Sequence, residues 1–151
     1  MDEVGPLPFG LSSEELGQVR ITYTSHSAKT GVGKSQVVIT GAGQVRLLEE
    51  AFLDDPNPQT AEGEVPPPVV ARLLDLMQEV DFFALEELYR GEGEAPGAVH
   101  VIELTLPGRS KKVMVSQPTT VVPFERVAGA IKLSAGLGLP AALQQRFFQR
   151  F

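Results

Sequence analysis

The chain has 151 residues, the length of one domain at roughly 100–200 residues per domain, and a formal net charge of −6 at pH 7. Hydrophobic residues make up 42% of it, which is enough to build a core and excludes wholesale disorder. The sequence contains no cysteine, and this excludes a disulfide scaffold, thiolate zinc sites and cysteine catalysis.

The charge is distributed unevenly along the chain. Residues 1–48 are neutral overall, residues 49–103 carry a net charge of −12, and residues 104–151 carry +6. An acidic middle argues against nucleic-acid binding, which needs a cationic surface. We expect the two charged segments to pack beside each other and partly neutralise.

The N-terminal ten residues are acidic and rich in proline and glycine, unlike a secretory signal. The apolar runs are far shorter than the roughly 18–20 residues that a membrane span needs. We therefore expect a cytoplasmic protein without a membrane segment.

The first half of the chain predicts a short helical turn and three strands. Ser12 and Glu15 have the spacing of a capping box, and Gly17 would end that turn. Residues 19–24 alternate between apolar and polar, residues 35–40 are rich in β-branched residues, and a tight turn then leads into a strand through about residue 49.

Proline dominates the next segment, residues 54–68, which we expect to be a loop. The prolines at residues 66–68 fit the first turn of a helix. Apolar residues then recur at helical spacing through residue 80, and Phe82 and Phe83 are expected to seal the core at the end of this helix.

The second half predicts a hairpin and a second helix. Strands at residues 99–106 and 111–115 flank a Pro-Gly turn, and a helix at residues 121–133 ends before two glycines. A short helix is expected at residues 140–151.

Together these elements predict an α+β fold, with an antiparallel sheet of about five strands, two helices on one face and a short C-terminal helix. The expected organisation is an N-terminal extension (residues 1–17), a single domain (18–138) with the Pro-rich loop at 54–68, and a C-terminal aromatic helix (139–151).

Residues 28–35 resemble a phosphate-binding loop, with Gly31, Gly33, Lys34 and Ser35 in the positions that would hold phosphates and magnesium. In a true phosphate loop the Lys-Ser pair opens a helix. Here a β-branched run follows, so we expect a turn between two antiparallel strands. Nucleotide binding is kept as an alternative function.

Other chemistry is weakly indicated. His26 and His100 have no histidine at metal-ligand spacing, so each is expected to lie at a strand end or on the surface. The serines lack a nucleophile elbow. We expect no catalytic residues, no metal and no cofactor, and therefore no enzyme.

Two segments are candidates for binding a partner. Arg109, Lys111 and Lys112 flank the predicted hairpin turn, where they would either meet an acidic partner or a phosphate, or blunt a sheet edge. Three C-terminal aromatic residues could dock in a groove of a partner or cover the domain's own sheet. These residues are Phe147, Phe148 and Phe151.

The order of these elements resembles that of the emfourin-like proteins, which are small bacterial inhibitors of thermolysin-type metalloproteases, and of related bacterial domains. The resemblance covers roughly residues 18–135, and its main motif is the Asp-Phe-Phe-x-Leu segment at residues 81–85 after a helix. The Pro-rich insertion at residues 54–68, residues 91–97 and the C-terminal helix depart from the family pattern. The resemblance implies the fold and, less directly, protease inhibition, and no contact residues are transferred.

The sequence therefore predicts a small non-catalytic module that binds another protein, with a metalloprotease as the partner that the resemblance implies. The alternatives are nucleotide binding through the phosphate-loop-like segment and an accessory subunit that docks through its C-terminal helix.

Overall fold

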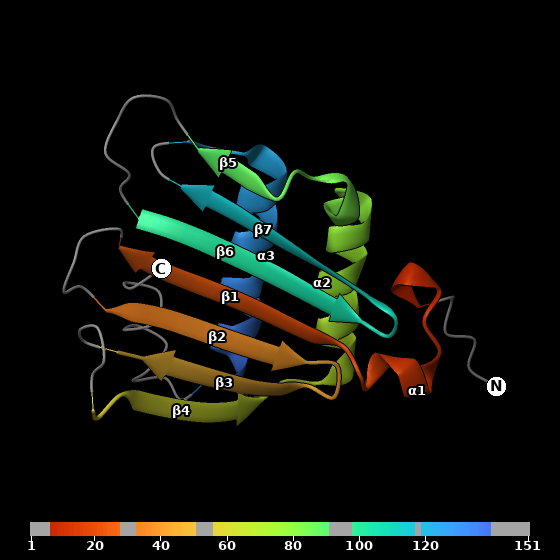
Figure 1. Cartoon of the computed structure of the whole chain (residues 1–151). Helices are drawn as coiled ribbons and strands as arrows, with labels where there is room; N and C mark the ends of the chain where they lie inside the picture. The colour runs from red at the N-terminus through yellow and green to blue at the C-terminus, as the bar shows by residue number, and fades with distance from the viewer. Residues whose placement is uncertain (1–6, 28–32, 51–55, 91–97, 117–118, 140–151) are drawn as a thin grey trace.

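A computed structural model describes residues 7–27, 33–50, 56–90, 98–116 and 119–139. It has an α+β architecture in which one seven-stranded sheet is covered on one face by two helices (Figure 1). The sheet order is β4-β3-β2-β1-β6-β7-β5. All neighbours pair antiparallel except β5 and β7, which are parallel. The strands are β1 (Arg20–Ser27), β2 (Lys34–Thr40), β3 (Gln44–Glu49), β4 (Gln59–Glu64), β5 (Leu88–Arg90), β6 (Ala98–Leu106) and β7 (Arg109–Ser116).

The helices of the described residues are two long ones, which cover the sheet, and three short elements. Two of them, α2 (Pro67–Glu79) and α3 (Val122–Gly138), lie behind the sheet in Figure 1 and cover one of its faces. The short elements are η1 (Pro8–Gly10), α1 (Ser13–Leu16) and η2 (Phe82–Ala84). The predicted capping box is confirmed at α1, where the Glu15 N–H donates to Ser12 Oγ at 3.0 Å and the Ser12 N–H donates to Glu15 Oε1 at 2.9 Å.

The core lies between the sheet and the two long helices. Strand alternation buries one side of β1, β2 and β6, so that Ile21, Ile39 and Leu104 are fully buried. Leu74 of α2 and Ile131 of α3 are fully buried from the opposite side. Phe82 is also fully buried, which confirms that an aromatic residue seals the core after α2.

A glycine lets α3 approach the edge of the sheet. A Cβ at Gly63 of β4 would lie 1.7 Å from the carbonyl oxygen of Gly138 at the end of α3. Because no side chain fits that gap, Gly63 allows the end of the helix to rest directly on the backbone of β4.

The α+β class and the face covered by helices are confirmed, but the sheet is larger and mixed, not five antiparallel strands. The two additional strands are its edges. Strand β4 lies inside the segment predicted as a loop, because its residues alternate only between exposed and half-exposed positions and it is held by backbone pairing with β3. Strand β5 has three residues and depends on its parallel pairing with β7.

The second helix also differs from the prediction. It continues to Gly138 and does not stop before Gly136. Gly136 is one of the buried residues of α3, so packing at the end of the helix outweighs the weak helix propensity of glycine. The predicted C-terminal helix at residues 140–151 lies outside the described residues.

Candidate functional site

The sheet face that α2 and α3 leave uncovered is the candidate site, and we call it the open face. Its side chains alternate along each strand with those of the core. By register its middle contains the following residues: Arg20, Thr22 and Thr24 of β1; Gln36, Val38 and Thr40 of β2; Gln44, Arg46 and Leu48 of β3; Thr60, Glu62 and Glu64 of β4; Val101, Glu103 and Thr105 of β6; and Ser110, Lys112 and Met114 of β7. All of these are exposed or partly exposed. The same face continues with Leu88 of β5 and with one further row, which contains His26, Lys34, Val99, Ser116 and Arg90.

These side chains form three rows that run across the strands. The central row alternates in charge at both of its ends. From β4 to β7 it reads Glu62, Arg46, Val38, Thr22, Glu103 and Lys112. Arg46 and Glu62 are neighbours in this row, with a guanidinium nitrogen 3.8 Å from a carboxylate oxygen and side chains 69% and 72% exposed.

The two other rows flank the central row. We call one the apolar row, because it carries Leu48, Val101 and Met114. From β4 to β7 it reads Thr60, Leu48, Gln36, Thr24, Val101 and Met114. The other, the polar row, lies at the end of the sheet near the β2–β3 turn and reads Glu64, Gln44, Thr40, Arg20, Thr105 and Ser110.

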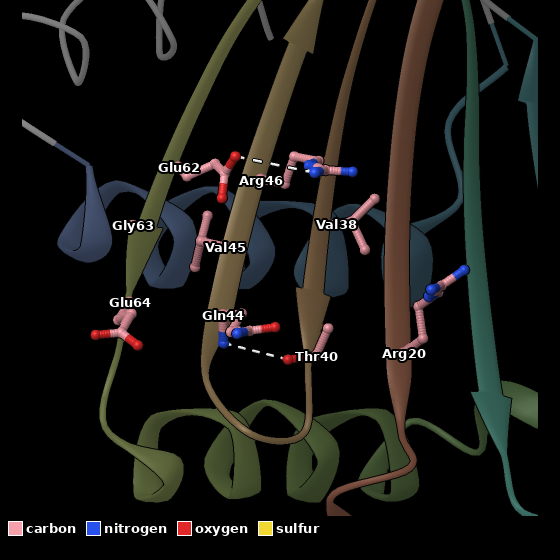
Figure 2. Close-up of a pocket in the computed structure, with 9 residues that line it drawn as sticks. All are labelled: Arg20, Val38, Thr40, Gln44, Val45, Arg46, Glu62, Gly63 and Glu64. Atoms are coloured by element: carbon pink, nitrogen blue, oxygen red, sulfur yellow. Dashed lines mark hydrogen bonds and ion pairs between the residues drawn. The ribbon is translucent and has the colours of Figure 1, made fainter.

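The β1–β4 half of the open face is hollowed. A cavity of about 470 Å³ is lined by Arg20 and Arg46, by Glu62 and Glu64 of β4 and by the aliphatic Val38, among others (Figure 2). A neighbouring hollow of about 370 Å³ extends it toward Leu48 and Thr60. The two hollows therefore place guanidinium and carboxylate groups beside the aliphatic side chains of Val38 and Leu48. Within the described residues no cluster of three or more metal-ligating side chains occurs.

The phosphate-loop-like segment is only partly described, because Gly31 lies in the undescribed range 28–32. The remaining residues do not open a helix: Lys34 is the first residue of β2, and Ser35 is buried on the helix-covered face. Gly33 precedes this strand. The prediction that a strand follows the motif is therefore confirmed.

The predicted basic group does not form one patch, because strand alternation separates its members. Lys112 pairs with Glu103 on the open face, whereas Lys111 and Arg109 lie opposite the buried Leu104 and Leu106. The guanidinium carbon of Arg109 lies 4.0 Å from the centre of the Phe83 ring and 5.7 Å from that of Phe9. Arg109 thus caps an aromatic pair of its own chain. Phe147, Phe148 and Phe151 lie outside the described residues.

Sequence reasoning missed a polar pair on the helix-covered face. The hydroxyl of Tyr23 lies 3.0 Å from Nδ1 of His100, and the two rings are stacked with centroids 6.0 Å apart. Burial, and secondarily the carboxylate of Glu125, raises the pKa of Tyr23, so its hydroxyl remains protonated and can donate to the neutral imidazole.

His100 is half-buried, and burial lowers its pKa against the opposing effect of Glu125. The missed signal was alternation: His100 is two residues before the core residue Ile102, and Tyr23 two after Ile21, so both point inward.

No family model matches the sequence, and no curated protein matches it either. Among the described helices, none is both long and apolar enough to cross a membrane.

Proposed function

We propose that this chain is a non-catalytic protein-binding module and that the open face is its binding surface. The observation that carries the proposal is that no helix of the described residues covers one face of the seven-stranded sheet, which presents aliphatic side chains among charges of both signs. Protein interfaces likewise contain both apolar and polar side chains.

The shape of the surface favours a protein over a small molecule. Pockets for small ligands are concave, mostly apolar and bury most of the ligand. Here the hollows are lined largely by charged and polar side chains, and the three rows extend well beyond them across six strands. A surface that broad matches a partner with a surface of its own.

A metalloprotease of the thermolysin type is the specific partner class that the resemblance to the emfourin-like proteins suggests. The direct test is an inhibition assay with a thermolysin-type protease over a wide range of molar excess. Unchanged protease activity at large excess would remove this class of partner and leave the wider proposal to be tested by capture.

The wider proposal is tested by affinity capture from cells that naturally produce the chain, with three baits compared quantitatively. The baits are the wild type, Leu48→Glu on the open face and Leu133→Glu on the outer side of α3. Leu48 is partly exposed and Leu133 is 67% exposed, so both changes add the same charge without filling the core.

We expect at least one other protein to be retained by the wild type and by Leu133→Glu and to be lost with Leu48→Glu. If no other protein follows this pattern, the open face is not a surface for a different protein. Untagged copies of the chain that the cells themselves produce are counted separately from other captured proteins.

A further inference from the structure

We propose that the open face binds a second copy of this chain, face to face, about a twofold axis that lies in the interface parallel to the strands. This inference rests on the proposed function, because it names the partner of the same surface. It is carried by the order of charges in the central row, which is complementary to itself when reversed.

The symmetry determines which residues would meet. A twofold axis parallel to the strands, passing between β1 and β2, reverses the strand order of the second copy and keeps each row opposite itself. Arg46 then faces Glu103 of the other copy, and Glu62 faces Lys112 of the other copy. Because each contact occurs twice, the central row would provide four pairs of opposite charge and no pair of like charge.

The flanking rows agree with the same axis. In the apolar row, Leu48 would face Val101, and Thr60 would face Met114. In the polar row, Arg20 would face Thr40, and the remaining pairs also bring a charged group opposite a neutral one or join two neutral groups. No like charges meet in any of the three rows, and in the apolar row the aliphatic side chains of Leu48 and Val101 meet each other.

A twofold axis at right angles to the strands would give the opposite result. It would lay each strand over its own copy, so that Arg46 would face Arg46 and Glu62 would face Glu62 if the central row lay on the axis. Like charges in an interface cost several kcal/mol, a penalty that disfavours this arrangement. With the central row on the axis, the charge order therefore favours the axis parallel to the strands.

The dimensions of the sheet allow the pairing. Stacked sheets lie roughly 10 Å apart, with strand directions within about 30° of each other. Arg46 and Glu103 each lie about 7 Å from the axis. An angle of about 30° between the two sheets would therefore shift these residues by only about 4 Å relative to each other, a distance that long side chains can span. The six strands that overlap cover roughly 600 Å² per copy, at the lower end of the range of standard interfaces, about 600–1,000 Å² per partner.

The test exploits the reciprocity of the Arg46–Glu103 contact. Arg46→Glu alone and Glu103→Arg alone would each place two like-charge contacts in a homodimer. An equimolar mixture of the two variants would restore both contacts in a heterodimer, because the two substituted side chains would face each other and so would the two native ones. The double variant Arg46→Glu/Glu103→Arg would restore them in a homodimer.

Sedimentation equilibrium of the full chain, with light scattering as a second readout, measures the dimer Kd. We expect a dimer for the wild type, a Kd raised about 10–100-fold in each single variant, and recovery in the mixture and in the double variant. Arg72→Glu on the exposed side of α2 is the matched control and should leave the Kd unchanged.

Two results would overturn the inference. One is a wild type that stays monomeric up to about 1 mM, the weak end of specific association. The other is a dimer whose Kd responds to Arg72→Glu as strongly as to Arg46→Glu, or whose single variants do not recover on mixing. A monomeric wild type whose capture of another protein is lost with Leu48→Glu would refute self-pairing alone, and the binding-module proposal would remain.

Discussion

The contact between β4 and the end of α3 allows a prediction in which one type of substitution has opposite effects at two sites. At Gly63 an added Cβ would lie 1.7 Å from the Gly138 carbonyl oxygen and 2.7 Å from its carbon, both backbone atoms. At Gly129, in the middle of α3, nothing lies within 4 Å of an added Cβ. Both changes are Gly→Ala, so the composition of the chain changes identically.

Gly63→Ala should destabilise the protein by about 1–3 kcal/mol, the usual cost of forcing extra volume into a packed site. The end of α3 would have to retreat by more than an ångström, and β4, as an edge strand, is held by only one neighbour. Gly129→Ala should stabilise the protein by about 0.5–1 kcal/mol, because glycine is the weaker helix former in a helix interior.

Urea denaturation of the full chain, followed by far-UV circular dichroism, measures both free energies of unfolding. Equal stability of Gly63→Ala and the wild type would show that α3 does not rest on β4 and would refute the reasoning. A destabilised Gly129→Ala would show that the outer face of α3 is covered.

Three further predictions concern single side chains. Arg109→Ala should lower the free energy of unfolding by about 0.5–1 kcal/mol, because an exposed cation–π contact with Phe83 is lost; Lys112→Ala in the same strand is the control, and an equal effect would contradict the aromatic role. Ser12→Ala should cost about 0.5–2 kcal/mol through loss of the helix cap, measured against Ser13→Ala in the same denaturation assay. The free energy of unfolding should fall as the pH drops below about 6.5. Below that pH His100 becomes protonated in the unfolded chain, whereas in the folded chain burial keeps its pKa lower and its imidazole neutral. Glu125 opposes this lowering of the pKa, and Lys132 and His26 add to it. His100→Asn should flatten that slope, and an unchanged slope would show that His100 does not produce it.

The central strands could be predicted from sequence because their alternation and turns are local signals. The sequence predicts strands at residues 19–24, 35–40 and 45–49, and apart from residue 19 all of these lie in β1, β2 and β3. The edges of the sheet could not be predicted this way. The polar β4 is held in place by its partner β3, and the three residues of β5 depend on a parallel neighbour distant in sequence.

The open face shows the same division between local and non-local information. Alternation alone assigns Thr22, Arg46 and Lys112 to one side of their strands, and it also predicts that Lys111 and Lys112 face opposite sides. The order of the rows requires pairings that no local pattern contains. Glu103 lies beside Thr22 only because β6 pairs with β1 across most of the chain. The self-complementary charge order is therefore visible only once the register is known.

Charge balance connects the sequence to the proposed partner. The expectation that the acidic and basic segments pack together is confirmed where Arg126 of α3 donates to Glu79 of α2 at 2.9 Å. The three rows carry three basic and three acidic side chains, so this part of the open face is neutral although the chain is not. A face that binds nucleic acid needs an excess of positive charge. Self-pairing about the proposed axis instead requires that the charges of the central row face their opposites, and the order Glu62, Arg46, Glu103 and Lys112 meets that requirement.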